Sequence, residues 1–512
     1  MPYRVLIADS GEPAVRIAIT AREMGFIPLG LYTKEDTDAY HRRYMHEDKE
    51  VSSYFDAKEV VEAALELGAD AVHPGYGLLN ENPEFASEVT RKGLVFIGSS
   101  PSTISFARDK IVLKVYAEKM DIPTLPWAEV FKPEDVEEFA EVHGYPVVIR
   151  VADSSSVAAR VARSGSEVEQ ALRDVKSRAG KILKDFKLYV EPYIANAKYV
   201  EVQVVSDGER TVHLYERECI LRSNSKIAIA EAPSPSLSST ERGRLYEYAV
   251  LIAKSLRYVG VGSVVFILDL EKGEAYLADV KAGLQPGYSA TEAITGIDIP
   301  RKQLEVALYH ALDLKQEDVG RQGYAIEAVV YAENPLSGEP ASGRVTRYLE
   351  PQGAELRVYS GISAGSSISG RYDFVVSRIV TWSPDRTTAL RRMREALSEY
   401  TIEGVATNIR VLRYIVESRE FAKALCTCGF YDEARLGIAE KLREELLVHS
   451  VIASAIVEYG DEGSKNLLKK QRVLERIVES ERIRGIKRNV WYYYVALRSS
   501  LGRMRRTSRK KR

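Results

Sequence analysis

Cysteine is scarce in this sequence, with three residues among 512. So few thiols do not form a disulfide framework, which indicates a reducing compartment and predicts a cytoplasmic location. Long hydrophobic runs are missing too, since no segment approaches the roughly 18 apolar residues of a membrane span. The first residues, MPYRVLIADSGEP, do not have the pattern of a cleavable signal. We therefore expect no association with a membrane.

Net charge is close to zero, at −1, although 28% of the residues are charged and 45% are hydrophobic. A disordered chain would combine few apolar residues with a high net charge, so this composition excludes that class. At roughly 150 residues per domain, the length predicts two to four folded domains. The 34 glycines are an ordinary share of the chain, so their positions carry more information than their number.

The N-terminal part alternates short β-branched runs with helical patterns, which predicts a doubly wound parallel sheet. Strands are expected over Tyr3–Ala8, Phe26–Leu31, Ala71–His73 and Val95–Ile97, with helices over Ala14–Met24 and Ala57–Leu67. From about Pro123 a small α/β lobe is expected. Its strands are Pro146–Val151, Leu188–Pro192 and Val200–Val205. A larger α+β region follows from Val212, and the chain reads as helical after Phe430.

Positive charge is concentrated at the C-terminal end. Twelve Lys or Arg residues and one acidic residue lie between Glu481 and Arg512. Such a basic tail is typical of segments that contact an acidic surface or nucleic acid. The alternative is a solvated terminus with no partner, which we favour over nucleic-acid binding.

Seven segments resemble motifs of the biotin carboxylase family and occur in the family's order. They are Asp9–Ala14 (DSGEPA), His73–Asn82 (HPGYGLLNEN), Ala107–Lys110 (ARDK), Glu216–Cys219 (EREC), Glu231–Pro235 (EAPSP), Thr291–Asp298 (TEAITGID) and Gly404–Asn408 (GVATN). The family's versions read NRGEIA, HPGYGFLSEN, GDK, ERDC, EAPAP, TEMITGVD and GIKTN. Together they cover roughly residues 3 to 425, and the set is far more specific than any one segment.

The resemblance implies an α/β, ATP-grasp fold and divides the chain into four parts. These are an N-terminal pre-ATP-grasp domain over residues 1–115, a lid over 116–206, an ATP-grasp core with C-terminal domain over 207–430, and a helical extension with the basic tail over 431–512. The extension is loosely similar to the extra C-terminal helices of biotin carboxylase subunits in archaeal acyl-CoA carboxylases.

The resemblance also implies a reaction in which ATP and Mg²⁺ activate bicarbonate before biotin is carboxylated. Nucleotide contacts of the family fall on Lys110, Arg150 and Glu191. Arg357 matches the arginine that stabilises the biotin enolate, and Gln285 is the one residue kept from the bicarbonate motif RIQVEHP.

Many other positions differ from the family. Where the family has a glycine-rich phosphate loop, this sequence reads VADSSSVAAR over Val151–Arg160 and contains no glycine. Within this stretch, Asp153 would repel phosphate. At the metal positions, the first carboxylate is Val265, the second is Asp279 and the asparagine is Lys281. Because the Lys281 ammonium would pair with Asp279 and compete with a cation, these residues argue against Mg²⁺.

The bicarbonate motif is altered as well. Its arginine has become Gly283, its base has become Gly287, and Pro286 has no N–H to donate. The terminal lysine of the family's QRRHQK falls on Ile227. Loss of the general base alone would typically lower the rate ~10²–10⁴-fold. Because catalytic residues act as a unit, several losses at once argue more strongly against activity than one.

Two functions follow from these observations. The first is a catalytically lapsed subunit of a biotin-dependent acyl-CoA carboxylase with a structural or regulatory role, in which ATP binding is left open. The alternative is an active ATP-dependent biotin carboxylase, or a related ligase, with a rearranged site. In both cases the chain carries no covalently bound biotin. The expected partners are a second copy of the chain, a biotin carboxyl carrier and a carboxyltransferase.

Overall fold

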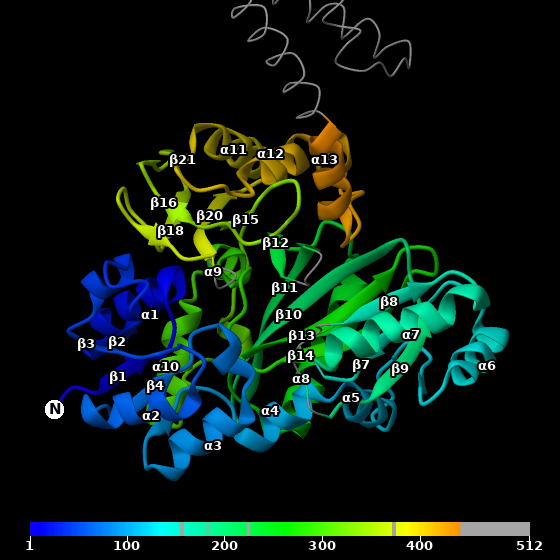
Figure 1. Cartoon of the computed structure of the whole chain (residues 1–512), viewed down its shortest axis with the longest axis horizontal. Helices are drawn as coiled ribbons and strands as arrows, with labels where there is room; N and C mark the ends of the chain where they lie inside the picture. Colours follow the sequence, from blue (N-terminus) through cyan, green and yellow to red (C-terminus); the bar gives the residue numbers. More distant parts are fainter. Residues whose placement is uncertain (154–157, 182, 184, 223–225, 371–374, 441–512) are drawn as a thin grey trace, which may run out of the picture. The chain divides into compact units, whose positions relative to one another are not determined.

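The computed structural model describes residues 1–153, 158–181, 183, 185–222, 226–370 and 375–440 (Figure 1). Contacts within the chain define two units, Met1–Ala434 and Arg435–Arg512. The account below concerns the first unit. Most of the expected helical extension, including the whole basic tail, lies outside the described residues.

A parallel five-stranded sheet forms the N-terminal part, in the order β3-β2-β1-β4-β5. Its elements are β1 (Arg4–Ile7), α1 (Gly11–Glu23), β2 (Ile27–Tyr32), η1 (Tyr40–Tyr44), β3 (Glu47–Glu50), α2 (Ala57–Glu66), β4 (Ala71–His73), η2 (Leu78–Glu81), α3 (Pro83–Arg91) and β5 (Val95–Phe96). The predicted parallel sheet is confirmed. Strand β3 escaped prediction because it is an edge strand of sequence EDKE, which buries no apolar side chain.

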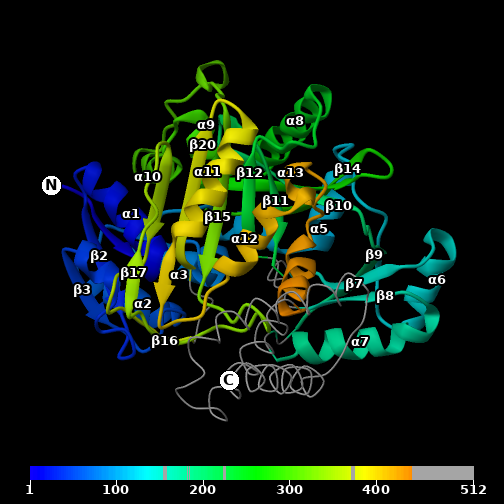
Figure 2. The same ribbon diagram turned by 90° about the horizontal axis from the view of Figure 1, so that it is seen from above.

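A four-stranded sheet in the order β6-β9-β7-β8 builds the small lobe (Figure 2). After α4 (Pro101–Arg108) and α5 (Lys110–Glu118), the lobe contains β6 (Ala128–Glu129), α6 (Pro133–His143), β7 (Val147–Val151), β8 (Ala159–Ala162), α7 (Gly165–Ala179) and β9 (Leu188–Pro192). Helix α7 packs on β7 and β8. Its Val168, Leu172 and Val175 are at most 3% exposed, and their spacing places them on one helical face.

The largest sheet has eight strands in the order β14-β13-β10-β11-β12-β15-β20-β18. The strands are β10 (Ala197–Asp207), β11 (Thr211–Leu221), β12 (Ile227–Ala232), β13 (Val259–Asp269), β14 (Glu274–Lys281), β15 (Tyr324–Tyr331), β18 (Leu356–Ser360) and β20 (Val375–Ser383). The assignment of Val200–Val205 to the small lobe is wrong. These residues belong to β10, an interior strand of the large sheet that pairs with β11 on one side and with β13 on the other. Local spacing predicts a strand here, but the sheet that it joins depends on neighbours far away in the sequence.

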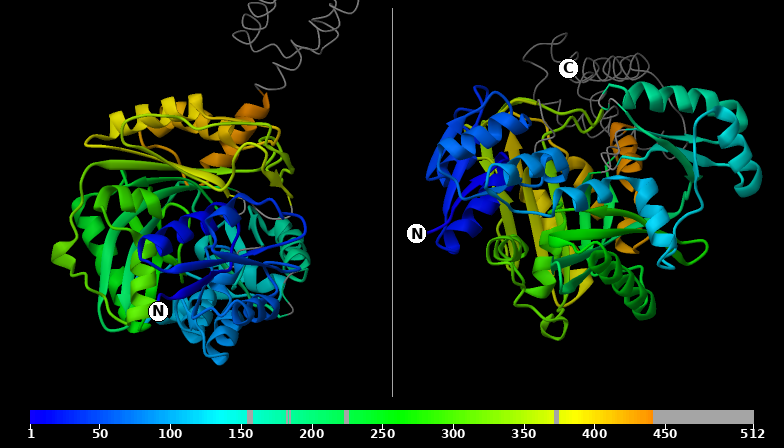
Figure 3. Two further views of the ribbon diagram at one scale, coloured as in Figure 1. Left: turned by 90° about the vertical axis from the view of Figure 1, so that its left-hand side faces the viewer. Right: turned by 90° about the horizontal axis from the view of Figure 1, so that it is seen from below.

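Helices cover this sheet, and small strand pairs flank it. The elements are α8 (Ser239–Ser255), α9 (Tyr288–Thr295), α10 (Ile299–Tyr309), η3 (Gln316–Asp318), β16 (Gly343–Arg344), β17 (Arg347–Leu349), β19 (Ser367–Ile368), α11 (Arg386–Glu399), β21 (Thr401–Glu403), α12 (Ile409–Glu417) and α13 (Arg419–Ala422). Helix α11 packs on β15 and β20, while α8 packs on β10 and β11 (Figure 3). Within the described ranges, no helix combines the length and apolar character that crossing a bilayer requires.

His73, the last residue of β4, predicts a loss of stability in acid. It is fully buried, its Nδ1 accepts a hydrogen bond from Gly75 N at 3.0 Å, and burial lowers its pKa to about 3. The unfolded chain therefore binds a proton below pH ~6.5 that the folded chain does not, so stability falls by roughly 1.4 kcal/mol per pH unit below that point. We expect the free energy of unfolding in urea, measured between pH 7 and 5, to change less with pH in His73→Asn than in the unmodified chain. The pH dependence should be unchanged in His143→Asn, which alters an exposed histidine. Equal slopes in all three proteins would contradict the prediction.

Candidate functional site

A cavity of about 680 Å³, called the cleft below, lies between the small lobe and the edge of the eight-stranded sheet. The lobe contributes residues of β7, β8 and β9 to its wall, and the sheet contributes residues of β10, β13 and β14. Six positions singled out from the sequence line this one cavity: Lys110, Arg150, Asp153, Glu191, Asp279 and Lys281. The fold therefore brings together residues that are up to 171 positions apart in the chain.

Asp279 is held between two lysines at one end of the cleft. Its Oδ1 accepts a hydrogen bond from Lys110 Nζ, and its Oδ2 lies 2.9 Å from Lys281 Nζ. Burial alone would raise the pKa of the Asp279 carboxyl, but the two ammonium groups hold it below its usual range. Asp279 and Lys281 are two residues apart on β14 and so share one face of the strand. The pairing expected from the sequence is confirmed, and Lys110 adds a second cation to it.

Glu191, on β9, is also held by two cations. Its Oε1 lies 2.8 Å from Arg150 Nε, and its Oε2 lies 2.8 Å from Lys114 Nζ. Burial would raise the pKa of this carboxyl, but Lys114 and Arg150 lower it below the usual value. The Arg150 side chain keeps 41% of its surface exposed, on the cleft wall. Glu191 therefore positions Arg150 and carries no uncompensated charge into the cleft.

The first residues of the expected phosphate loop are fastened to the helix pair α4–α5. Lys110 N donates to Ala152 O at 2.7 Å, and Arg108 Nη2 lies 2.7 Å from Asp153 Oδ2. The expectation that Asp153 repels phosphate has to be corrected, because the guanidinium of Arg108 neutralises this carboxylate. Residues 154–157 of the loop lie outside the described residues.

Gln285 joins the cluster of Lys110, Asp279 and Lys281, called the lysine cluster below, through a carboxylate. Its Nε2 donates to Glu81 Oε1 at 3.2 Å, and the same oxygen lies 3.8 Å from Lys281 Nζ. Glu81 thus connects the surviving residue of the bicarbonate motif to the end of β14. The amide is engaged by this protein side chain.

Val265 stands on the second strand of the eight-stranded sheet, next to the edge strand β14. It is on β13, is fully buried, and pairs with Asp279 on β14 and with Glu201 on β10. The adjacent Glu201 carboxylate is hydrogen-bonded by Arg217, which also donates to Gln203 Oε1 at 2.8 Å. A hydrocarbon side chain therefore occupies the first metal position of the family, and its acidic neighbour is already paired.

Gly283 lies directly against Asn80. A Cβ atom at position 283 would stand 2.1 Å from Asn80 Oδ1, far inside van der Waals contact. Asn80 is 1% exposed and donates from Nδ2 to Leu284 O at 3.1 Å. In the family's HPGYGFLSEN segment this position is a serine. The larger Asn80 therefore occupies space next to the position where the family has its arginine.

Gly287 is enclosed by side chains of the core. Its φ is +99°, and a Cβ atom would lie 3.1 Å from Ala230 Cβ, 3.2 Å from Arg217 Nε and 3.3 Å from Ile227 Cδ1. Ile227 stands where the family has a lysine, so two substituted positions pack against each other. The buried Pro286 precedes this glycine. A side chain at position 287 would be strained at this φ and would require its neighbours to shift by a few tenths of an ångström.

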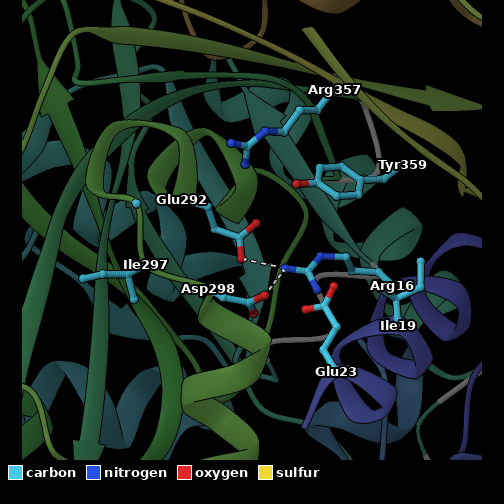
Figure 4. Close-up of a pocket in the computed structure, with 9 residues that line it drawn as sticks. Arg16, Ile19, Glu23, Glu292, Ile297, Asp298, Arg357 and Tyr359 are labelled. Carbon is cyan, nitrogen blue, oxygen red and sulfur yellow. Dashed lines mark hydrogen bonds and ion pairs between the residues drawn. The ribbon is translucent and has the colours of Figure 1, made fainter. Parts of the chain in front are cut away.

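Arg357 does not line the cleft. It is exposed on β18 and lines a separate pocket of about 360 Å³, together with Arg16, Glu23, Glu292, Asp298 and Tyr359 (Figure 4). In that pocket Arg16 Nη2 lies 2.9 Å from Asp298 Oδ2 and 3.1 Å from Glu292 Oε1. The structure therefore separates Arg357 from the lysine cluster.

Sequence reasoning missed three groups that organise the site. Lys114 holds Glu191, Glu81 connects Gln285 to Lys281, and Asn80 covers Gly283. One of them carried a usable signal, because Lys114 follows Lys110 by four residues and shares its helical face. The other two stand in the HPGYG-like segment, whose contacts lie about 200 residues further along the chain.

Comparison with known proteins places the whole first unit in one family. Residues 1–104 match the model of the biotin carboxylase N-terminal domain, residues 109–315 that of the carbamoyl-phosphate synthase L chain ATP-binding domain, and residues 327–433 that of the biotin carboxylase C-terminal domain. Biotin carboxylase 1 of Bacillus subtilis is 34% identical over 82% of this chain and 96% of its own. The human mitochondrial propionyl-CoA carboxylase alpha chain is 35% identical over 84% of this chain and 61% of its own.

Solved structures agree with these relatives. The biotin carboxylase domain of Hydrogenobacter thermophilus 2-oxoglutarate carboxylase, a dimer solved with MgADP, ADP and bicarbonate, matches with a TM-score of 0.80. It is 32% identical to this chain and covers 85% of it and 97% of the solved chain. Family models, relatives and fold thus point the same way, and the chain belongs to the biotin carboxylase family, the ATP-grasp ligase component of biotin-dependent carboxylases.

Proposed function

We propose that this chain is a biotin carboxylase-type subunit of a biotin-dependent acyl-CoA carboxylase that no longer carboxylates biotin and serves a structural or regulatory role. The observation that carries the proposal is the enclosure of Gly287. Glycine has no side chain to act as a base, and three core atoms lie within 3.3 Å of the place where its Cβ would stand. The space that the family's base would occupy is therefore closely packed by this chain's own residues.

The neighbouring positions support the same proposal. Asn80 fills the space beside Gly283, and Val265 leaves Asp279 without a second carboxylate. Electrostatic stabilisation by fixed charges and donors is usually the largest catalytic contribution. A site without its base, its arginine and its main-chain donor has lost that contribution together with proton transfer.

What the chain retains favours a role inside an assembly. The cleft keeps Lys110, Arg150 and Glu191, so we propose that it still binds a nucleotide. The name of the human relative, an alpha chain, indicates a carboxylase built from more than one kind of chain. We therefore propose a second copy of the chain, a biotin carboxyl carrier and a carboxyltransferase as partners, and an acidic surface as the contact of the basic tail.

The test is a turnover assay on the purified full-length chain. ADP release is measured with ATP, free biotin and Mg²⁺, with and without bicarbonate, beside biotin carboxylase 1 of Bacillus subtilis as a positive control. We expect no increase in ADP release when bicarbonate is added to this chain, because the base and the anion-binding arginine are absent. A bicarbonate- and biotin-dependent rate would instead support the alternative of an active ligase with a rearranged site, and would overturn the proposal.

A further inference from the structure

The end of the cleft formed by α5 and β14 carries a built-in positive charge. Lys110 and Lys281 flank the single carboxylate of Asp279, one ammonium on each oxygen. Although burial lowers the pKa of Lys281, the carboxylates of Asp279 and Glu81 raise it above the usual value. Lys110, Asp279 and Lys281 carry one excess positive charge among the three, and the carboxylate of Glu81, 3.8 Å from Lys281 Nζ, offsets part of it.

This cluster does not fit Mg²⁺. A magnesium ion requires near-octahedral coordination by oxygen ligands, and both Asp279 oxygens are already hydrogen-bonded to ammonium groups. Val265 offers no oxygen, and the adjacent Glu201 is bound by Arg217. Among the described residues, no group of three or more His, Cys, Asp or Glu side chains is arranged to hold a metal.

We infer that the Lys110–Asp279–Lys281 cluster takes the place of the metal, so that the cleft binds the unchelated phosphate tail of a nucleoside di- or triphosphate and Mg²⁺ weakens this binding. The inference rests on the proposed function, since it assigns a ligand to the cleft of a subunit without turnover. It reverses the sign of the metal effect expected for an ATP-grasp site.

The charges on the cleft wall support an anionic ligand. Six cationic side chains and three carboxylates are among its described lining residues: Lys110, Arg150, Arg160, Arg178, Lys226 and Lys281 against Asp153, Glu191 and Asp279. Each carboxylate has a cationic partner, at Arg108, at Lys114 with Arg150, and at Lys110 with Lys281. Two of the cations also pair with carboxylates outside this lining, Arg160 with Asp174 and Lys281 with Glu81. The charge of the lining residues that face the cavity is positive.

The remaining wall favours a nucleotide over inorganic polyphosphate. Apolar side chains of Leu125, Leu221, Ile267 and Leu277 line the same cavity. A cavity of about 680 Å³ falls within the usual range for small-molecule sites, about 300–1,000 Å³. A ligand with a flat apolar base and a charged tail uses both kinds of wall.

The expected effect of Mg²⁺ follows from electrostatics. A chelated phosphate tail carries two fewer negative charges and presents a hydrated dication to the ammonium groups, which repel it. A charge-assisted hydrogen bond from Lys281 to a phosphate oxygen is stronger than a neutral one. The free nucleotide therefore gains a contact that the magnesium complex loses.

Calorimetry of the full-length chain with ADP tests this inference. In EDTA we expect binding that weakens ~10-fold or more when Mg²⁺ is in excess over ADP. Lys281→Asn, the family's residue, should lose ~10-fold or more of the affinity measured in EDTA and should no longer be weakened by Mg²⁺. Lys272→Asn, which changes an exposed lysine in the same β13–β14 hairpin, should behave like the unmodified chain. Binding that tightens with Mg²⁺ would overturn the inference.

A second measurement needs no variant. Cys428 lines the cleft and is partly exposed, whereas Cys219 and Cys426 are buried. ADP should slow alkylation of Cys428 more strongly in EDTA than with Mg²⁺, and AMP and tripolyphosphate should each protect less than ADP. Equal protection by tripolyphosphate alone would contradict the nucleotide assignment. Absence of any binding overturns the inference together with the proposed nucleotide binding, and leaves the proposed loss of biotin carboxylation standing. Bicarbonate-dependent turnover overturns that proposed loss itself.

Discussion

Replacing Arg378 with methionine is expected to destabilise the chain by about 3–5 kcal/mol, because two buried carboxylates lose their cation. Arg378 is fully buried, with Nη2 2.7 Å from Glu12 Oε1 and Nη1 3.5 Å from Glu327 Oε1. Its guanidinium carbon also lies over an aromatic ring, 4.4 Å from the centroid of Tyr288. The measurement is the free energy of unfolding in urea at neutral pH.

Two further variants show whether the loss comes from unpaired charge. Arg391→Met removes an arginine that is 61% exposed and pairs with Glu395, and should cost less than about 0.5 kcal/mol. Adding Glu12→Gln to Arg378→Met removes one of the two buried carboxylates that have lost their cation, and should recover part of the lost stability. An additive loss in the double variant would contradict this explanation.

The second large effect is expected from Gly287→Glu, which restores the family's base in name only. The backbone at φ +99° disfavours any side chain, at a cost of about 1–3 kcal/mol. Packing against Ala230, Arg217 and Ile227 adds about 1–3 kcal/mol of overpacking. We therefore expect a loss of several kcal/mol in unfolding free energy and no gain of bicarbonate-dependent ADP release.

A matched glycine separates these two costs. Gly93 has φ +82°, and a Cβ atom there would have no neighbour within 4 Å. Gly93→Glu should therefore show only the backbone cost, about 1 kcal/mol. If the two variants lose equal stability, the enclosure of Gly287 is not the reason for the effect. Recovered turnover in Gly287→Glu would also count against the proposed lapse of catalysis.

Gly287 and Arg378 belong to one connected structure. Glu327 accepts hydrogen bonds from Gly287 N at 2.9 Å and Ala290 N at 3.0 Å, and so anchors the N-terminus of α9 on β15. Arg378 holds Glu327 from the neighbouring strand β20. The same carboxylate thus fixes the turn at the former base position and joins it to the buried charge network.

Local patterns predicted the parts of the molecule that depend on local spacing. The parallel N-terminal sheet and helices α1 and α2 follow from short-range hydrophobic periodicity. The Asp279–Lys281 pair follows from the two-residue repeat of a strand. The edge strand β3 and the place of β10 did not follow, because both depend on neighbours far away in the sequence.

Motifs along the chain were enough to identify the family, the fold class and the residues that replace the reaction's usual groups. The folded chain was needed to show which side chains occupy the space of the missing groups. Asn80 lies beside Gly283, Ile227 packs against Gly287, and a lysine contacts each oxygen of Asp279. A motif specifies the residue type at each position, so a missing base or metal ligand can be identified from the sequence directly. Packing and ion pairing join side chains from distant strands and helices, so whether a lost group leaves an open pocket or a filled one is settled by the folded core.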